Sequence, residues 1–278
     1  MEYQKQTVGL NRNNIDKFYT SGKCVLLCIN YIINNIIIDK NSDLIIEPSA
    51  GNGSFITPIK NLTTNWLFYD LKPENNEIIK QDFLTFDYKD INLNSNIKQI
   101  HIIGNPPFGR QSSLAIKFIK KSCEFCSTIS FILPKSFKKN SLKKHFPMCF
   151  HLVLEVDLPD NSFLVDNVEY NVPCVFQIWI KKITNRPAVD KLQSINFKFV
   201  LKTENPDISF RRVGVNAGFI DTNIDKNIQS HYFIKFTNNK SIEDNLQKLS
   251  NIQFTESNTV GPRSISKQEL IYKFNLCI

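Results

Sequence analysis

The chain has 278 residues, of which 42% are hydrophobic and 22% are charged, so a sizeable core can form and the charged fraction is typical of a soluble domain. No basic start followed by an apolar core stands at the N-terminus, and three asparagines interrupt the longest apolar run, 25–38. We therefore expect neither a signal peptide nor a membrane span, and an intracellular, cytoplasmic protein with no membrane partner.

Apolar spacing predicts the elements in chain order. Residues 1–22 form a polar arm, and residues 23–38 have the spacing of a helix. Six short apolar runs follow, at 43–47, 66–69, 99–103, 128–133, 151–156 and 173–180. Their alternation with helical or loop stretches predicts βαβ units in a mostly parallel sheet with helices on both faces. The last two runs lack a helix between them, which favours an antiparallel hairpin at the sheet edge.

The composition of the chain changes after about residue 182. Residues 183–278 are more polar, and their one clear signal is a capping box, Ser266 with Glu269, which predicts the start of a helix. We therefore expect a domain over 23–182 and a small appended region over 183–278.

The first apolar run opens into a glycine-rich turn. Glu47 ends the run and Gly51 and Gly53 follow it, so the backbone of the turn is open to a ligand. Asp70 closes the second run, where a carboxylate can accept ribose hydroxyls, and Asp82 is expected at the end of a further strand, near an adenine amine. The third glycine of a dinucleotide fingerprint is absent and one acid precedes the turn, which favours a methyl donor over NAD.

The most specific feature is Asn105-Pro106-Pro107-Phe108, which follows the third apolar run. Two prolines fix the backbone and hold the Pro106 carbonyl in a set direction. This carbonyl and the Asn105 side-chain oxygen can accept both N–H groups of a planar amine. The Phe108 ring can stack on a base.

Basic residues cluster after this motif. Between 110 and 144 there are nine lysines and arginines and one acid, which together with the formal net charge of +8 favours a nucleic acid partner. Arg110, Lys135 and Lys138 are candidates for phosphate contacts. The seven cysteines have no disulfide-framework or zinc-ribbon spacing, so no metal is expected.

On these residues the chain resembles the S-adenosylmethionine-dependent amino-methyltransferases, in particular the N6-adenine group with the [DN]-P-P-[FYW] signature. The segment Asp16-Lys17-Phe18-Tyr19-Thr20 is similar to that group's N-terminal motif, and the motifs follow in the gamma order of adenine DNA methyltransferases. The resemblance covers 11–182 and implies a Rossmann-like methyltransferase fold, with a mostly parallel seven-stranded sheet that has an antiparallel edge strand.

The resemblance also implies roles. S-adenosylmethionine would be the cofactor, bound by Phe18, Thr20, Glu47, Gly51, Gly53, Asp70, Asp82 and Asn105. The catalytic residues would be Asn105, Pro106, Pro107 and Phe108. In that family an aromatic residue before the late strand packs on the flipped base, for which Phe163 is the first candidate here and Tyr170 the second.

Several functions share these signatures. We expect methylation of adenine N6 in nucleic acid and favour DNA, with ribosomal, transfer or cap-proximal RNA as the competing substrate. Enzymes that methylate guanine N2 or protein glutamine use a similar motif. A non-catalytic nucleic-acid-binding scaffold is the remaining alternative, and the intact donor-site residues argue against it. The region 183–278 is a candidate for target recognition.

Overall fold

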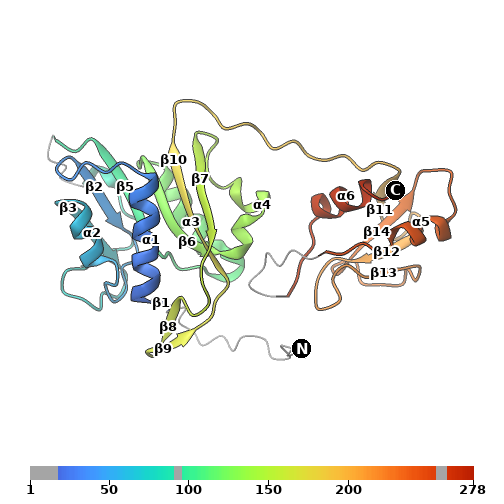
Figure 1. Ribbon diagram of the computed structural model, residues 1–278, viewed down its shortest axis with the longest axis horizontal. Coiled ribbons are helices and arrows are strands. Elements are labelled where there is room, and N and C mark those ends of the chain that lie inside the picture. The colour runs from blue at the N-terminus through green and yellow to red at the C-terminus, as the bar shows by residue number, and fades with distance from the viewer. Residues whose placement is uncertain (1–17, 91–95, 255–261) are drawn as a thin grey trace. The chain divides into compact units, whose positions relative to one another are not determined.

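The computed structural model describes residues 18–90, 96–254 and 262–278, which form two compact units (Figure 1). The first unit ends at Pro187 and the second begins at Ala188. The predicted arm therefore lies mostly outside the described residues, and so do Asp16 and Lys17.

The first unit is built on a seven-stranded sheet in the order β4-β3-β2-β5-β6-β10-β7. The strands are β2 (Asp43–Glu47), β3 (Asn65–Asp70), β4 (Ile79–Lys80), β5 (Gln99–Gly104), β6 (Thr128–Pro134), β7 (Phe150–Asp157) and β10 (Cys174–Lys181). The strands from β4 to β6 are parallel, and β10 lies antiparallel between β6 and β7. This arrangement confirms the predicted Rossmann-like methyltransferase fold, with the antiparallel pairing at the edge.

Helices cover both faces of this sheet. They are α1 (Gly22–Asn35), α2 (Ile56–Leu62), α3 (Ser113–Cys123) and α4 (Asn140–Lys143). On one face α1 packs against β10, where Tyr31 stacks on Phe176 with ring centroids 6.3 Å apart. On the other face α3 buries Phe118 and Ile119 in a cluster with Ile102 of β5. No helix in the described part of the chain has the length and apolar character needed to cross a membrane.

Helix α1 ends three residues before its predicted end. Ser21 caps its start by accepting the Cys24 N–H at 3.3 Å, and the backbone becomes extended at Ile36. The three isoleucines after Asn35 continue the apolar spacing but are β-branched, and branched side chains favour extended backbone. The helix prediction over 23–38 was therefore too long.

A hairpin that the sequence did not predict stands between β7 and β10. It consists of β8 (Phe163–Val165) and β9 (Val168–Tyr170), joined at Asp166 and Asn167, whose φ angles are +50° and +62°. Aspartate and asparagine tolerate this left-handed conformation, which two-residue hairpin turns require. Strand β8 also pairs with β1 (Tyr19–Thr20), so the hairpin fixes the first described residues of the chain.

The second unit has its own sheet and core. Its strands are β11 (Phe197–Val200), β12 (Ile208–Arg211), β13 (Ile220–Asp221) and β14 (His231–Phe236), all antiparallel, in the order β11-β14-β12-β13. Its helices are α5 (Ile242–Leu249) and α6 (Lys267–Asn275). The predicted capping box is confirmed at the start of α6, where Ser266 and Glu269 cap each other's backbone. The core contains Phe210, Ile234 and Phe274.

Candidate active site

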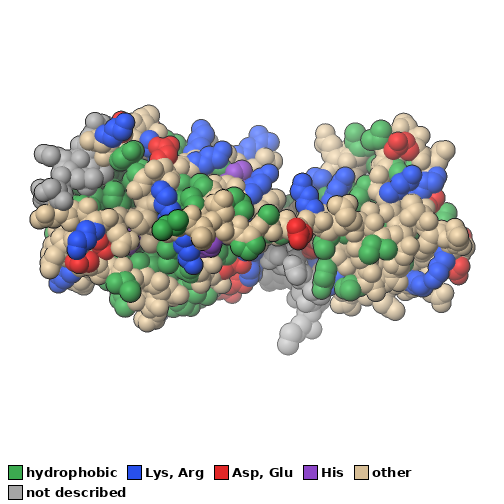
Figure 2. Space-filling view, turned by 90° about the horizontal axis from the view of Figure 1, so that it is seen from above, with side chains coloured by type: hydrophobic (Ala, Val, Ile, Leu, Met, Phe, Trp, Pro, Cys, Tyr) green, Lys and Arg blue, Asp and Glu red, His purple; other side chains and the backbone are tan. Residues whose placement is uncertain are grey.

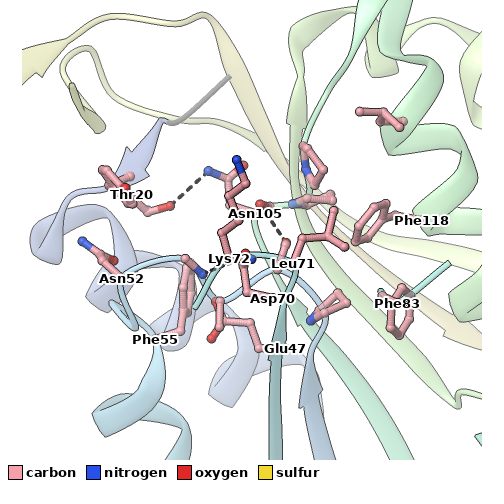
Figure 3. Close-up of a pocket in the computed structure, with 18 of the residues that line it drawn as sticks. Thr20, Glu47, Asn52, Phe55, Asp70, Leu71, Lys72, Phe83, Asn105 and Phe118 are labelled. Carbon is pink, nitrogen blue, oxygen red and sulfur yellow. Dashed lines mark hydrogen bonds between the residues drawn. The ribbon is translucent and has the colours of Figure 1, made fainter. Parts of the chain in front are cut away.

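A cleft of about 450 Å³ opens at the carboxyl ends of the parallel strands. Glu47 is the last residue of β2, Asp70 is the last residue of β3, and Asn105 directly follows β5. Ligands of open α/β sheets bind at this edge, and the volume is within the usual range for small-molecule sites. Figure 3 shows Phe83 and Phe118 at one end of the cleft and Thr20 and Asn52 at the other.

The structure brings most of the predicted residues to this cleft. Its lining includes Phe18, Thr20, Glu47, Gly51, Asp70, Asp82, Asn105, Pro106, Pro107 and Phe108. Six predicted residues do not line it, namely Gly53, Arg110, Lys135, Lys138, Phe163 and the second candidate Tyr170.

The glycine-rich turn depends on backbone angles that favour glycine. Gly51 has a φ of +55° and Gly53 a φ of +89°, and a Cβ on Gly53 would meet the Ile56 side chain at 2.6 Å. Gly53 therefore shapes the turn before α2 without facing the cleft. Asp70 holds the turn to the sheet, because its carboxylate accepts the N–H of Gly51 and that of Lys72, each at 2.8 Å.

Glu47 is a buried carboxyl group with an unused oxygen. The residue is 2% exposed, and Oε2 has no hydrogen-bond partner within the described ranges of the chain. Burial, together with the nearby charge of Asp70, raises the pKa of Glu47 well above its usual value. A buried polar atom without a partner is costly. A ligand that donates a hydrogen bond or carries a positive charge would remove this cost.

Asn105 is oriented by the N-terminal segment. Its Nδ2 donates to the Phe18 carbonyl at 3.3 Å and to the Thr20 hydroxyl at 3.2 Å (Figure 3). A carbonyl accepts only, so the amide nitrogen must face Phe18 and the amide oxygen must face the other way. That oxygen, Oδ1, is buried, and no residue in the described part of the chain forms a hydrogen bond with it. The side chain that lines the cleft therefore carries an acceptor that is already oriented and unused.

The N-terminal segment is itself held at three points. Thr20 pairs with Phe163 across β1 and β8, and the Phe18 ring stacks on Tyr170 with centroids 5.6 Å apart. The Tyr19 hydroxyl donates to Glu74 at 2.7 Å. Phe163 is 1% exposed and serves as core under this strand, so the structure does not bring it to the cleft as the sequence predicted.

Asp82 lies beyond a shorter strand than expected. Strand β4 ends at Lys80, and the Asp82 carboxylate accepts the Leu84 N–H at 2.9 Å in the following turn. The residue still reaches the cleft. Next to it, the buried Phe83 stacks on Phe118 of α3 with centroids 5.4 Å apart, which gives this end of the cleft an apolar wall.

Sequence reasoning missed several lining residues. They include Asn52, Phe55, Lys72, Glu74, Phe83 and Phe118. Asn52 and Phe55 lie within or beside the recognised turn, so their position was the available signal. Phe118 had no local signal, because it shares its helix face with ordinary core residues.

The predicted phosphate contacts stand apart from the cleft. Lys135 and Lys138 both pair with Asp157, at 3.3 and 3.0 Å, and two more lysines of the basic run pair with acids. Arg110 is exposed and follows Gly109, whose φ is +67°. In Figure 2 the basic side chains are spread over the visible face rather than gathered in one patch. Carboxylates therefore partly neutralise the basic run.

The described residues hold no group of three or more histidine, cysteine, aspartate or glutamate side chains suited to a metal ion. Cys123 and Cys126 are core residues of the first unit, and burial raises the pKa of the Cys123 thiol to about 12. These thiols are therefore protonated and unreactive at neutral pH.

No protein-family model and no curated protein sequence matches the chain. Solved structures give distant similarities only. A Listeria monocytogenes protein assigned to the class I S-adenosylmethionine-dependent methyltransferases is 13% identical, with a TM-score of 0.45 over 65% of this chain and 66% of the Listeria protein's length. A Pyrococcus horikoshii protein assigned as an RNA methyltransferase is 14% identical, with a TM-score of 0.44 over 64% and 94%.

A dimethyladenosine transferase from Plasmodium falciparum is 16% identical, with a TM-score of 0.40 over 59% of this chain and 63% of that protein. These similarities are too distant to indicate what this chain binds or does.

Proposed function

We propose that this protein transfers a methyl group from S-adenosylmethionine to the exocyclic N6 amine of adenine in a nucleic acid. The observation that carries the proposal is the Asn105 side chain. Its nitrogen is bound by Phe18 and Thr20, while its oxygen is buried in the cleft without a partner. An amine presented to the cleft would supply the missing donor.

The cleft residues fit the donor molecule. The unpaired oxygen of Glu47 suits a cationic ammonium group, and the carboxylate of Asp70 has lone pairs left for ribose hydroxyls after accepting two backbone N–H groups. Phe83 and Phe118 offer apolar surface for a purine ring. When bound, the donor supplies an electrophilic methyl group on a sulfonium sulfur.

Asn105 and Pro106 would do the work of positioning. Their oxygens accept the two N–H groups of the target amine and so fix its nitrogen in the cleft. The same oxygens stabilise positive charge that develops on this nitrogen during transfer. Neither group titrates near neutral pH, so they hold the amine protons during transfer. The nitrogen–methyl bond would form as the sulfur–methyl bond breaks, S-adenosylhomocysteine would leave, and the extra proton on nitrogen would pass to solvent.

The target base must leave its stack to enter the cleft. Base-modifying enzymes either flip the nucleotide out of a duplex or act on an unpaired strand. Phe108 lines the cleft and is only half-buried, so its ring is open to contact with an incoming base. The N-terminal segment supports DNA as the polymer, because a segment of this type belongs to the gamma group that the sequence resembles.

One assay tests the proposal. The protein is incubated with methyl-labelled donor and separate pools of duplex DNA, single-stranded RNA and capped RNA, and each pool is digested to nucleosides. We expect label in N6-methyladenine nucleosides, and the DNA and RNA pools identify the polymer. Label in N2-methylguanosine, or in protein alone, would overturn the assignment. Calorimetry with S-adenosylmethionine separates an enzyme from a scaffold, which need not bind it.

A further inference from the structure

The second unit carries a pair of arginines brought together by a short antiparallel bridge. Arg212 follows β12 and Arg263 precedes α6, and the bridge pairs Val213 with Ser264. The carbonyl groups of both arginines accept hydrogen bonds across this bridge, at 2.8 and 2.9 Å. Each arginine is the residue before a bridged one, so both side chains leave the bridge on the same face.

These two guanidinium groups have donors without acceptors. Nε of Arg212 and both Nε and Nη2 of Arg263 are buried and have no hydrogen-bond partner among the residues that the structure describes. Within the described residues neither arginine forms an ion pair. Nε and Nη2 form one edge of the guanidinium fork, which can bind two oxygens of one phosphate or carboxylate. Unpaired buried donors are costly, and an anion bound to this edge would satisfy them.

Aromatic rings hold the cations of this cluster in place. The Arg212 guanidinium lies 5.2 Å from the centre of the Tyr232 ring on β14. The Lys267 ammonium lies 5.8 Å from the same ring and 4.6 Å from that of Phe199. Cation–π contacts of this kind fix a positive charge without neutralising it. The two chain segments involved, 208–214 and 263–267, contain no acidic residue.

We propose that Arg212, Arg263 and Lys267 form a phosphate-binding site for the backbone of a nucleic acid. The guanidinium edge matches the paired oxygens of a phosphodiester, and rings beside the cations can stack on unpaired bases. The proposal rests on the proposed function for the identity of the polymer only. By this proposal, the second unit binds the phosphate backbone of the nucleic acid and does not distinguish one base sequence from another.

The test compares two variants that each remove two positive charges from the second unit. In Arg212→Gln/Arg263→Gln the unpaired donors are lost. In the control, Lys240→Ala/Lys248→Ala, the lost charges lie on and before α5. Binding of the full-length proteins to labelled duplex DNA, single-stranded DNA and single-stranded RNA is followed by fluorescence anisotropy over a range of salt concentrations. Calorimetry with S-adenosylmethionine and thermal unfolding check that both variants are folded.

We expect the arginine variant to lose about tenfold or more in affinity and to reduce the salt-dependence slope by about two, as the loss of two phosphate contacts requires. The control should keep most of the wild-type affinity and most of the wild-type salt-dependence slope. Arg263→Lys, which retains the charge but not the fork, should show an intermediate loss. Equal affinity in the arginine variant and the wild type, or an equal loss in the control, would overturn the proposal.

The two proposals fail in different ways. If the wild type binds nucleic acid through these arginines but transfers no methyl group to adenine, the phosphate site stands and the proposed reaction does not. If methyl transfer to adenine occurs and the arginine variant binds as tightly as the wild type, the phosphate site is wrong and the reaction stands.

Discussion

Replacing Asn105 with alanine should separate catalysis from folding. The side chain makes two hydrogen bonds, to Phe18 and Thr20, and carries one buried oxygen without a partner. Two lost hydrogen bonds cost about 2 kcal/mol, but removing the unpaired oxygen recovers about 1 kcal/mol or more. We therefore expect the free energy of unfolding to fall by about 1 kcal/mol or less.

The rate of methyl transfer should fall much more than the free energy of unfolding does. Removing one preorganised group that stabilises transition-state charge in a water-excluded site costs about 2.7–4 kcal/mol, which corresponds to a loss of about 10²–10³ in rate. Donor binding should change little, because Glu47 and Asp70 remain in place. Single-turnover transfer of labelled methyl to adenine-containing DNA and RNA measures the rate, calorimetry measures donor affinity, and urea unfolding measures stability.

The matched control is Asn65→Ala. Asn65 also donates from its amide to a carbonyl, that of Asn41 at 3.0 Å, but it lies at the start of β3, at the opposite end of this strand from Asp70. It should transfer methyl at the wild-type rate. The reasoning fails if Asn105→Ala transfers methyl at an unchanged rate, or if its lost activity is accounted for by lost donor binding or by unfolding.

Four further substitutions test other parts of the argument. Burial and a neighbouring carboxylate raise the pKa of Glu47, so the folded protein keeps this proton above about pH 4.3, where the unfolded chain has lost it, and stability falls as pH rises. Glu47→Gln should therefore raise Tm at neutral pH, flatten that fall and weaken donor binding; an unchanged pH profile of Tm would contradict this. Thr20→Val, which removes an acceptor of the Asn105 amide, should lower kcat about tenfold while Thr20→Ser keeps most of it; equal rates would refute the positioning role. Asp157→Asn, which frees two lysines, should tighten nucleic acid binding and steepen its salt dependence, and weaker binding in anisotropy would contradict this. Arg186→Ala removes four hydrogen bonds to main-chain carbonyls and should cost about 2–4 kcal/mol in urea unfolding, against almost nothing for an exposed lysine variant.

The centre of the sheet could be predicted from the sequence because β2, β5, β6 and β10 are buried along most of their length. Strand β2 was predicted with its observed bounds, 43–47, since a short apolar run between polar segments leaves few alternatives. The predictions were wrong or missing for segments whose conformation no local sequence pattern determines. Ile36–Ile38 continues a helical pattern in apolar character alone, and the hairpin β8–β9 is held by pairing with β1, which is more than 140 residues away in sequence.

The residues of the candidate site also fall into those that a local sequence pattern predicts and those that it does not. Glu47, Asp70 and Asn105 could be found because each stands at the end of an apolar strand, where the chemistry of parallel sheets is concentrated. The interaction of Asn105 with Thr20 joins residues 85 positions apart, and no local pattern predicts it. Phe163 was assigned to the substrate from its place before a late strand, but pairing with Thr20 turns it into the core.

The insertion of β10 between β6 and β7 has a consequence for synthesis on the ribosome. Strand β7 pairs only with β10 in the described sheet, so the chain must be made at least to Lys181 before β7 has a neighbour. The first described strand, β1, likewise waits for Phe163. The earliest-made side chains of the cleft, at Phe18 and Thr20, are thus among the last to be fixed, and a nascent chain stalled before the hairpin would present an unfinished cleft to any chaperone that meets it.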